Sequence, residues 1–384
     1  MKAEKNKLRF SERSVGAKND LVSRRFLTQI VKVLFGQKIA GAAMILLFLF
    51  YFAAAFCEFL APYSLEYRNF EYNYAPPQPI RFVSEDGFQL RPFVYPIEGT
   101  RHPETRRKIY FENRDQPQPI RFFVRGETYR FWGLFETDLH LFGVEDGGPI
   151  FLLGTDSIGR DLFSRILYGA RISLTIGLVG VVLSFGIGLV VGSISGFFGG
   201  WIDHGVQRLI EVLQSFPAIP LWMALAAALP GNWSALQVYF GITVVLSLIG
   251  WTGLAREVRG KVLSLRQEVF VTAATVQGAG PTRILFHHLL PLLMSHIIVS
   301  LTLAVPAMIL AETALSFLGL GLRPPATSWG VLLTEAQNIE AIATHPWLLT
   351  PVVFVVMTVL AFHFVGDALR DAADPYRFSE FTQK

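Results

Sequence analysis

The sequence predicts an all-α polytopic membrane protein with six transmembrane helices and a small extracytoplasmic β-rich insertion between the first two. Of its 384 residues, 17% are charged and 52% hydrophobic, with a mean hydropathy of +0.41, whereas a soluble domain carries about 25% charged residues. Six stretches are also apolar and long enough to cross a bilayer core of about 30 Å as helices. They cover residues 39–60, 172–198, 212–229, 235–255, 289–311 and 347–366.

The distribution of lysine and arginine predicts the orientation of these helices. Residues 1–38 contain ten Lys/Arg against three acidic residues, and the loop over 256–291 contains five Lys/Arg. Since cytoplasmic loops are enriched in positive charge, we expect the N-terminus and this loop in the cytoplasm, and six crossings return the C-terminus to the same side. The basic pI of about 9.1 follows from this topology. We expect no nucleic-acid partner, because the chain shows no basic patch interleaved with aromatic residues.

The expected organisation has five parts. A basic cytoplasmic segment over 1–38 precedes the first transmembrane helix over 39–61, and a polar insertion follows over 62–150. A transmembrane domain with five helices over 151–377 precedes a cytoplasmic tail over 378–384. The basic start and its long apolar run do not have the form of a cleavable signal peptide. The single cysteine, Cys57, is expected to pack rather than react.

The insertion shows the short runs and turn residues typical of β-strands. Turns are expected at Asp86-Gly87 and Arg125-Gly126. The hexapeptide Pro-Gln-Pro-Ile-Arg-Phe occurs at 77–82 and again at 117–122, which indicates two equivalent strands of one small domain. Its many Arg and aromatic residues favour a docking role, since both are enriched at interfaces. The expected strands cover 79–83, 88–95, 108–112, 119–124, 128–134 and 139–142.

The loop over 265–291 carries the motif on which the functional prediction depends. The small-residue run Thr272-Ala273-Ala274-Thr275-Val276-Gln277 is followed by Gly278, and Leu290-Pro291 comes later. We expect a helix over 267–277, a break after it, and a second helix that begins at Pro281, because proline suits the first helical position. A helix of small residues at the membrane surface suits close docking to a soluble partner.

Four further blocks accompany this loop. The first runs from Leu153-Gly154-Thr155-Asp156 through Gly159-Arg160-Asp161 to Tyr168-Gly169-Ala170-Arg171, with Thr155 or Asp156 as the expected cap of an amphipathic helix that begins near Ser157. The others are Gly196-Phe197-Phe198-Gly199-Gly200-Trp201-Ile202-Asp203 with Phe216-Pro217, Glu312-Thr313-Ala314-Leu315-Ser316-Phe317 with Trp329-Gly330, and Gly366-Asp367-Ala368-Leu369 through Asp374-Pro375.

These motifs resemble the permease subunits of ABC importers, specifically the dipeptide/oligopeptide/nickel family. The loop resembles the family's EAA motif, with Thr272 in the acidic position and His288 in an aliphatic one. The resemblance covers the first span and about 150–377. It implies the type I ABC importer permease fold, location in a bacterial or archaeal inner membrane, and import of di- or oligopeptides, with nickel or another small solute as the alternative cargo.

The resemblance also implies how the chain would be driven. The loop would be a coupling element seated in a cleft of an ATPase subunit, and Glu268 would supply the acidic contact that Thr272 does not. The chain has no G-x-x-x-x-G-K-[ST] phosphate loop, so the motor is a separate protein. The implied partners are a second homologous permease, two ABC ATPase subunits, an extracytoplasmic solute-binding protein and the lipid bilayer. The implied coupling residues are Glu268, Thr272, Ala273, Ala274, Gly278, His288, Leu290 and Pro291.

Polar residues at membrane depth are the remaining candidates. Glu312 either lines the translocation path or braces the loop that follows it. Trp329 and Gly330 would face a binding protein or the channel mouth, with an interfacial tryptophan anchor as the alternative. Adjacent residues on a helix point about 100° apart, so the pair His287-His288 is not expected to bind metal. No catalytic residue, cofactor or metal is assigned to the chain.

Other functional classes fit the sequence less well. A secondary transporter needs mid-span acids or broken helices for ion coupling, and the predicted spans contain few acids. A membrane-anchored receptor built on 62–148 would leave the loop motif without a purpose. An intramembrane enzyme would need a catalytic pair or a Gly-x-Ser-x-Gly nucleophile, which the spans do not contain. A transporter permease without catalytic activity is therefore the favoured class.

Overall fold

The computed structural model describes residues 36–84, 87–101, 103–104, 108–144 and 148–373. Most of the predicted basic segment 1–38, the tail 378–384 and Asp374-Pro375 of the last motif lie outside the described residues. The chain divides into two compact units. Unit 1 combines Met1–Leu47, Leu265–Ala304 and Leu360–Lys384, and unit 2 combines Phe48–Ser264 and Val305–Val359.

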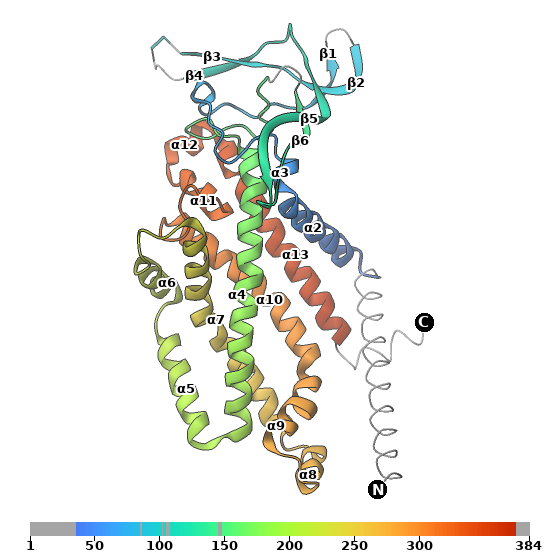
Figure 1. Ribbon diagram of the computed structural model, residues 1–384, viewed down its shortest axis with the longest axis vertical. Helices are drawn as coiled ribbons and strands as arrows, with labels where there is room; N and C mark the ends of the chain where they lie inside the picture. Colours follow the sequence, from blue (N-terminus) through green and yellow to red (C-terminus); the bar gives the residue numbers. More distant parts are fainter. Residues whose placement is uncertain (1–35, 85–86, 102, 105–107, 145–147, 374–384) are drawn as a thin grey trace. The chain divides into compact units, whose positions relative to one another are not determined.

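Most of the described chain is helical (Figure 1). Among the described residues, five helical stretches are long and apolar enough to cross a membrane, and a bent pair raises the number to six if it counts as one span. The helices that contain these stretches are α2 (Lys38–Ala55), α4 (Leu162–Phe198), α7 (Ala235–Leu265), α10 (Leu290–Phe317) and α13 (Thr350–Ala373). The shorter helices are α3 (Cys57–Leu60), α5 (Gly200–Ser215), α6 (Ala218–Ala227), α8 (Val269–Val276), α9 (Pro281–Arg283), α11 (Trp329–Leu333) and α12 (Ile339–Thr344).

The predicted third span over 212–229 is not one straight helix. It falls on the end of α5 and on α6, whose axes differ by 87°. The break lies at Phe216-Pro217, where Phe216 has extended backbone angles. A residue before proline is disfavoured in the helical region, because the proline ring clashes with its backbone. The apolar composition of residues 212–229 therefore predicted a membrane segment but did not predict the bend within it.

The structure corrects the predicted start of the helix that leads into the second span. No separate amphipathic helix begins near Ser157; instead α4 begins at Leu162 and runs without a break to Phe198. Its N-cap is Asp161, whose carboxylate accepts a hydrogen bond of 2.7 Å from the backbone N–H of Ser164. Asp156 forms ion pairs instead of capping the helix, because two arginines compete for its carboxylate. At 37 residues, α4 is roughly 55 Å long.

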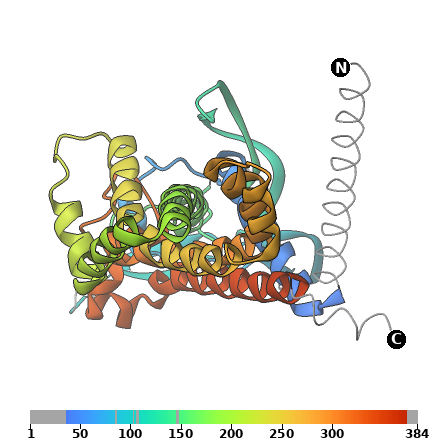
Figure 2. The same cartoon turned by 90° about the horizontal axis from the view of Figure 1, so that it is seen from below.

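Glycines on one face of α4 let α7 approach closely. A Cβ atom built on Gly188, Gly192 or Gly196 would lie 3.0, 2.4 or 2.8 Å from a backbone carbonyl oxygen of α7. The three glycines are four residues apart, so they lie on one stripe of the helix. Figure 2 looks along α4, which is the green helix seen nearly end-on. Small residues at such spacing allow backbone-to-backbone packing between membrane helices.

A partly buried charge pair stabilises the turn between α4 and α5. Gly199, with φ of +66°, caps α4 and leads directly into α5. Asp203 in the first turn of α5 accepts hydrogen bonds from both the Nε and the Nη2 of Arg259 on α7. The hydroxyl of Ser195 on α4 donates to the same carboxylate. Three helices are therefore joined at this end of unit 2.

The insertion in unit 2 contains two antiparallel sheets. One has four strands in the order β1-β2-β5-β6, and the other is the hairpin β3–β4. Strand β3 was not predicted, and the expected strands 119–124 and 128–134 form one strand, because Arg125-Gly126 lies at a bulge rather than a turn. The strands are β1 (Arg81–Ser84), β2 (Gly87–Val94), β3 (Ile97–Arg101), β4 (Lys108–Glu112), β5 (Gln118–Phe131) and β6 (Phe135–Val144).

The two copies of the repeated hexapeptide lie on opposite sides of β2. Arg81 of the first copy and Pro119 of the second are both register partners of Phe93. The copies are not equivalent in register, since the first pairs through its fifth residue and the second through its third. Phe93 between them is fully buried.

Replacing Gly192 by leucine tests the close packing of α4 on α7. We expect a loss of about 3 kcal/mol or more in the free energy of unfolding, because the side chain must displace a backbone carbonyl. The matched control is Gly186→Leu on the same helix, where an added Cβ meets nothing within 4 Å. Thermal unfolding of the purified protein in detergent measures both variants. Equal melting temperatures for the two variants would contradict the packing argument.

Candidate coupling loop and buried polar sites

The candidate coupling helix α8 ends in a capping arrangement that needs glycine. The N–H of Ala279 donates to the carbonyl of Ala274 at 3.0 Å, and the N–H of Gly278 donates to that of Thr275 at 2.9 Å. This pair of bonds defines a Schellman motif, in which the residue after the cap adopts left-handed angles. Gly278 has φ of +83°. The predicted break therefore lies at Gly278, and the helix itself runs from Val269 to Val276.

One face of α8 is apolar and exposed. Val269 and Val276 are 81% and 84% exposed, and Ala273 lies between them on the same face. Phe270, also exposed, lies at the edge of this face, whereas Val271 on the opposite side is buried. Ala274, next to this face, is half-buried. The outward apolar face of α8 is therefore formed by Val269, Ala273 and Val276.

The remaining coupling candidates flank this helix. Glu268 occupies the N-cap position without a side-chain capping bond, so its exposed carboxylate is directed to solvent rather than to the helix. Thr272 is exposed as well. Pro281 begins α9 as predicted, and a π-helical turn over Ile284–Leu289 connects α9 to α10. The motif ends on half-buried His288 and Leu290 and exposed Pro291, the last two in the first turn of α10.

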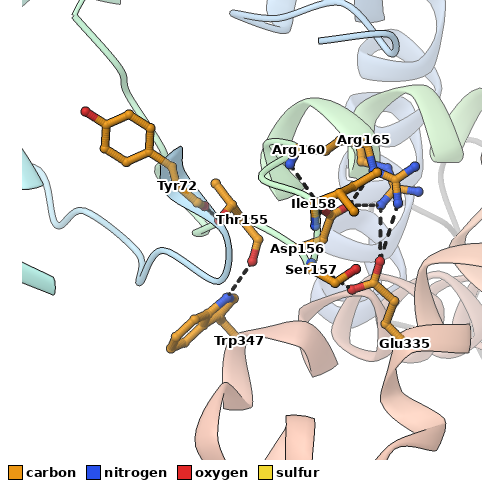
Figure 3. A network of polar contacts seen from close by, with 9 residues as sticks. All are labelled: Tyr72, Thr155, Asp156, Ser157, Ile158, Arg160, Arg165, Glu335 and Trp347. Carbon is orange, nitrogen blue, oxygen red and sulfur yellow. Dashed lines mark hydrogen bonds and ion pairs between the residues drawn. The ribbon is translucent and has the colours of Figure 1, made fainter. Parts of the chain in front are cut away.

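A second cluster of polar residues lies before α4 and is buried (Figure 3). Asp156, 1% exposed, accepts hydrogen bonds from Arg160 Nε at 2.6 Å and from Arg165 Nη1 at 2.5 Å. Glu335, in the connection between α10 and α13, accepts from Arg160 and from the backbone N–H of Ser157. Burial raises the pKa of Glu335, and the charge of Asp156 raises it further, while the two arginines oppose this. The cluster ties the start of α4 to that connection.

Thr155 and Trp347 extend this cluster. The Thr155 hydroxyl donates to the carbonyl of Tyr72 and accepts from the N–H of Ala75 at 2.7 Å. The indole N–H of Trp347 donates to the carbonyl of Thr155 at 3.0 Å. The sequence predicted Thr155 or Asp156 as a helix cap, but Thr155 bonds to Tyr72 and Ala75 and Asp156 pairs with two arginines. The run of charged residues beside glycines was the signal for these contacts. These hydrogen bonds connect three segments that are distant in the sequence, at residues 72–75, Thr155 and Trp347.

Glu312 is completely buried and bonded to hydroxyl groups. Its two carboxylate oxygens accept hydrogen bonds from Ser316 at 2.8 Å and from Ser173 of α4 at 3.2 Å. Ser173 in turn accepts from the backbone N–H of Trp329 at 3.1 Å. These contacts connect Glu312 to α4 and, through Ser173, to the loop that follows α10. Its two expected roles, lining the path and bracing that loop, stay predictions.

Trp329 and Gly330 lie inside unit 2 rather than on its surface. Trp329 is 0% exposed, and its indole N–H donates to the carbonyl of Ile166 at 3.1 Å. A Cβ on Gly330 would lie 2.7 Å from the carbonyl oxygen of Thr313. Neither the surface contact nor the interfacial anchor expected for Trp329 matches this burial, because the start of α11 packs tightly against α4 and α10.

A cavity that sequence reasoning did not find lies near the loop that precedes α11. Its volume is about 470 Å³, within the range of small-molecule sites. The connection between α6 and α7 lines it together with residues 320–326, and its lining includes the charged side chain of Arg323. No group of three or more metal-ligating side chains occurs among the residues that were described.

Comparison with known proteins assigns this chain to a family. A family model described as the binding-protein-dependent transport system inner membrane component matches residues 188–378, and one for the N-terminal TM domain of oligopeptide transport permease C matches 25–77. Over 223 residues, 58% of this chain and 70% of the relative, the chain is 41% identical to the oligopeptide transport system permease protein OppC of Bacillus subtilis. The chain belongs to the family of binding-protein-dependent transport system inner membrane components.

Two further proteins to which the chain is similar are a dipeptide permease and a methionine transporter. The chain is 42% identical over 224 residues to the dipeptide transport system permease protein DppC of Bacillus subtilis, covering 58% of this chain and 68% of that protein. The inward-facing MetNI methionine ABC transporter gives a TM-score of 0.45 at 21% identity, over 56% of this chain and 98% of that one. The strands β1–β6 lie outside both ranges matched by the family models.

The Schellman cap of α8 predicts that Gly278→Ala destabilises the candidate coupling loop of this inner membrane component. Left-handed angles cost an L-residue about 1–2 kcal/mol, so the end of α8 should fray. Gly280→Ala is the matched control, because Gly280 has φ of −71° and an added Cβ meets nothing within 4 Å. Hydrogen exchange at the amides of Gly278 and Ala279 reports the difference, with faster exchange expected only in Gly278→Ala. Unchanged exchange in both variants would rule out the role assigned to Gly278.

The buried cap of α4 predicts a pH dependence of stability. Burial raises the pKa of Asp161 to about 7, and the hydrogen bonds from Ser164 only partly oppose this. The unfolded pKa is about 4, so between these values the folded protein binds more protons than the unfolded chain. The free energy of unfolding therefore falls as the pH rises from about 4 to about 7.

Asp161→Asn should flatten this profile, because asparagine caps helices as well as aspartate but does not titrate. Between pH 5 and pH 7 we expect the variant to lose about 2 kcal/mol less stability than the wild type. Asp138→Asn, at an exposed aspartate of β6, serves as the control and should keep the wild-type slope. Chemical denaturation at several pH values measures the slopes. Parallel profiles for all three proteins would show that Asp161 does not titrate in this range.

Proposed function

We propose that this chain is the membrane-spanning permease subunit of an ATP-driven importer and forms half of the translocation pathway for di- or oligopeptides. Membership of the family of inner membrane components supports the class of machine. The names of the relatives, which are oligopeptide and dipeptide permeases, support the cargo. Import of nickel or another small solute by the same machinery is the alternative, and the ligand of the associated binding protein would decide between them.

The observation that carries this function is the exposed apolar face of α8. Val269, Ala273 and Val276 present an apolar stripe on a short helix, and Gly278 ends the helix abruptly. An isolated helix of eight residues gains little stability in water, and exposure of two valines adds to the cost. A groove on an ATPase subunit that covers this face would bury it, while Glu268 at the N-cap remains available for a basic partner residue.

The proposed assembly contains a second homologous permease, two ABC ATPase subunits and an extracytoplasmic solute-binding protein. The N- and C-termini and the loop over 265–291 would lie in the cytoplasm, which agrees with the positive charge of that loop. The insertion over 62–150 would then lie on the opposite side of the membrane. ATP-driven closure of the ATPase pair would move α8 and switch the transmembrane helices between outward-facing and inward-facing states.

Ala273→Arg tests the docking of α8 directly. The long charged side chain would stand at the centre of the apolar face, so we expect co-purification of ATPase subunits to fall at least about tenfold, equivalent to ~1.4 kcal/mol of lost binding. Thr282→Arg adds the same charge at an exposed position of α9 outside this face, and should leave co-purification unchanged. Tagged purification in mild detergent with mass spectrometry measures both. A wild-type protein that transports without any nucleotide-binding partner would overturn the proposal.

A further inference from the structure

The tip of the β5–β6 hairpin is an exposed apolar surface. Phe131 and Phe135 are register partners that close a loop of three residues, Trp132, Gly133 and Leu134. The exposed fractions of Trp132, Leu134 and Phe135 are 52%, 82% and 57%. Figure 1 shows this hairpin reaching down beside α3 and the end of α2. Neither matched family range includes this part of the chain.

An aromatic row connects this tip to the surface of α2. Phe48, Phe52 and Phe56 are four residues apart, so they lie along one face of the chain, and they are 67%, 45% and 38% exposed. Ring centroids are 6.3 Å apart for Phe48 and Phe52, and 4.6 Å for Phe52 and Phe56. The row continues to Phe131 at 5.8 Å and from there to Phe135 at 5.5 Å. The exposed face of a candidate span therefore continues into the hairpin tip without interruption.

Trp132 fixes the tip to the end of α2. Its φ of +50° is a left-handed conformation that bulky residues rarely adopt. Three contacts hold it there. The indole N–H donates to the carbonyl of Ala55 at 2.8 Å, and the backbone N–H donates to the carboxylate of Glu58 at 3.4 Å. The guanidinium of Arg171 lies 4.2 Å from the ring centroid. Arg171 is itself paired with Glu58. The orientation of the tip is therefore set by the helix end and not by the sheet alone.

We propose that this tip, residues 131–135, inserts into the membrane interface of the leaflet in which α2 ends, the outer leaflet in the proposed topology. Tryptophan, phenylalanine and leucine together are typical of residues at the boundary between hydrocarbon and water. Directly behind the tip, Arg130 and Glu136 form an exposed ion pair at 2.8 Å. Charged side chains at this position mark the level at which the hairpin leaves the apolar region.

Lipid is favoured over a protein as the partner of the tip because the aromatic row continues along α2. Only 28% of the apolar window of α2 is buried within the chain, so most of its surface is available to lipid. A second permease that packed on α2 would cover the same row, and the experiment below distinguishes the two. The insertion domain would thus be anchored by lipid as well as by its covalent connections to α2 and α4.

Fluorophore labelling at two matched leucines tests the proposal. Leu134→Cys places an environment-sensitive label at the tip, and Leu90→Cys places it on β2 of the same insertion, where Leu90 is 87% exposed. Phe135→Cys is a second tip position. The wild-type chain is the labelling blank, because its one cysteine, Cys57, is fully buried. The full-length protein, together with the subunits that co-purify with it, is placed in lipid nanodiscs that contain brominated phosphatidylcholine.

We expect brominated lipid to quench roughly half of the emission at positions 134 and 135, since an interfacial segment lies about 5–10 Å into the boundary region. The label at 90 should lose none to lipid but should be quenched by aqueous iodide. Equal iodide quenching at 134 and 90 would overturn the proposal and leave the tip in water. Protection of 134 from both quenchers would also overturn it, because a protein partner would then cover the tip.

Discussion

Polar groups buried in this protein must find partners within the chain, and α4 is arranged around that constraint. Before its first turn, Asp156 binds Arg160 and Arg165. Along its length, Ser173 bridges Glu312 and Trp329, and near its other end Ser195 shares Asp203 with Arg259. Removing one partner of a buried pair such as Asp156 and Arg165 costs about 3–5 kcal/mol. The start of α4 is therefore held strongly in unit 2, and the half-buried pair of Asp203 and Arg259 holds its other end.

Close packing of helix backbones at glycines complements these polar contacts. Polar contacts can join helices only where the backbones approach closely, and Gly188, Gly192 and Gly196 allow that approach to α7. Gly330 does the same where α11 meets Thr313. Within unit 2, small residues set the distance between helices and buried polar residues set which helices meet.

The conformation of the candidate coupling loop is fixed by other interactions than those around α4. The end of α8 is fixed by backbone hydrogen bonds and the conformation of Gly278 rather than by buried side chains. Its side chains are therefore left for a partner. The hairpin tip of the insertion is comparable, because Trp132 is anchored through its indole while Leu134 and Phe135 remain exposed. In both places a locally rigid backbone presents apolar groups outward, one toward the proposed ATPase and the other toward lipid.

The sequence by itself determined the membrane class, the approximate spans and the break at Gly278, because these depend on local composition and on backbone angles that only certain residues adopt. It also determined the start of a helix at Pro281. The bend at Phe216-Pro217 and the cap at Asp161 are local features that apolar composition did not predict. Tertiary structure decided the burial of Trp329, the contact of Ser173 with Glu312 and the pairing of Asp203 with Arg259. Each of these three depends on which distant segment lies alongside. Apolar periodicity cannot distinguish a tryptophan at a membrane surface from one packed against α4, because both positions accept its large apolar ring.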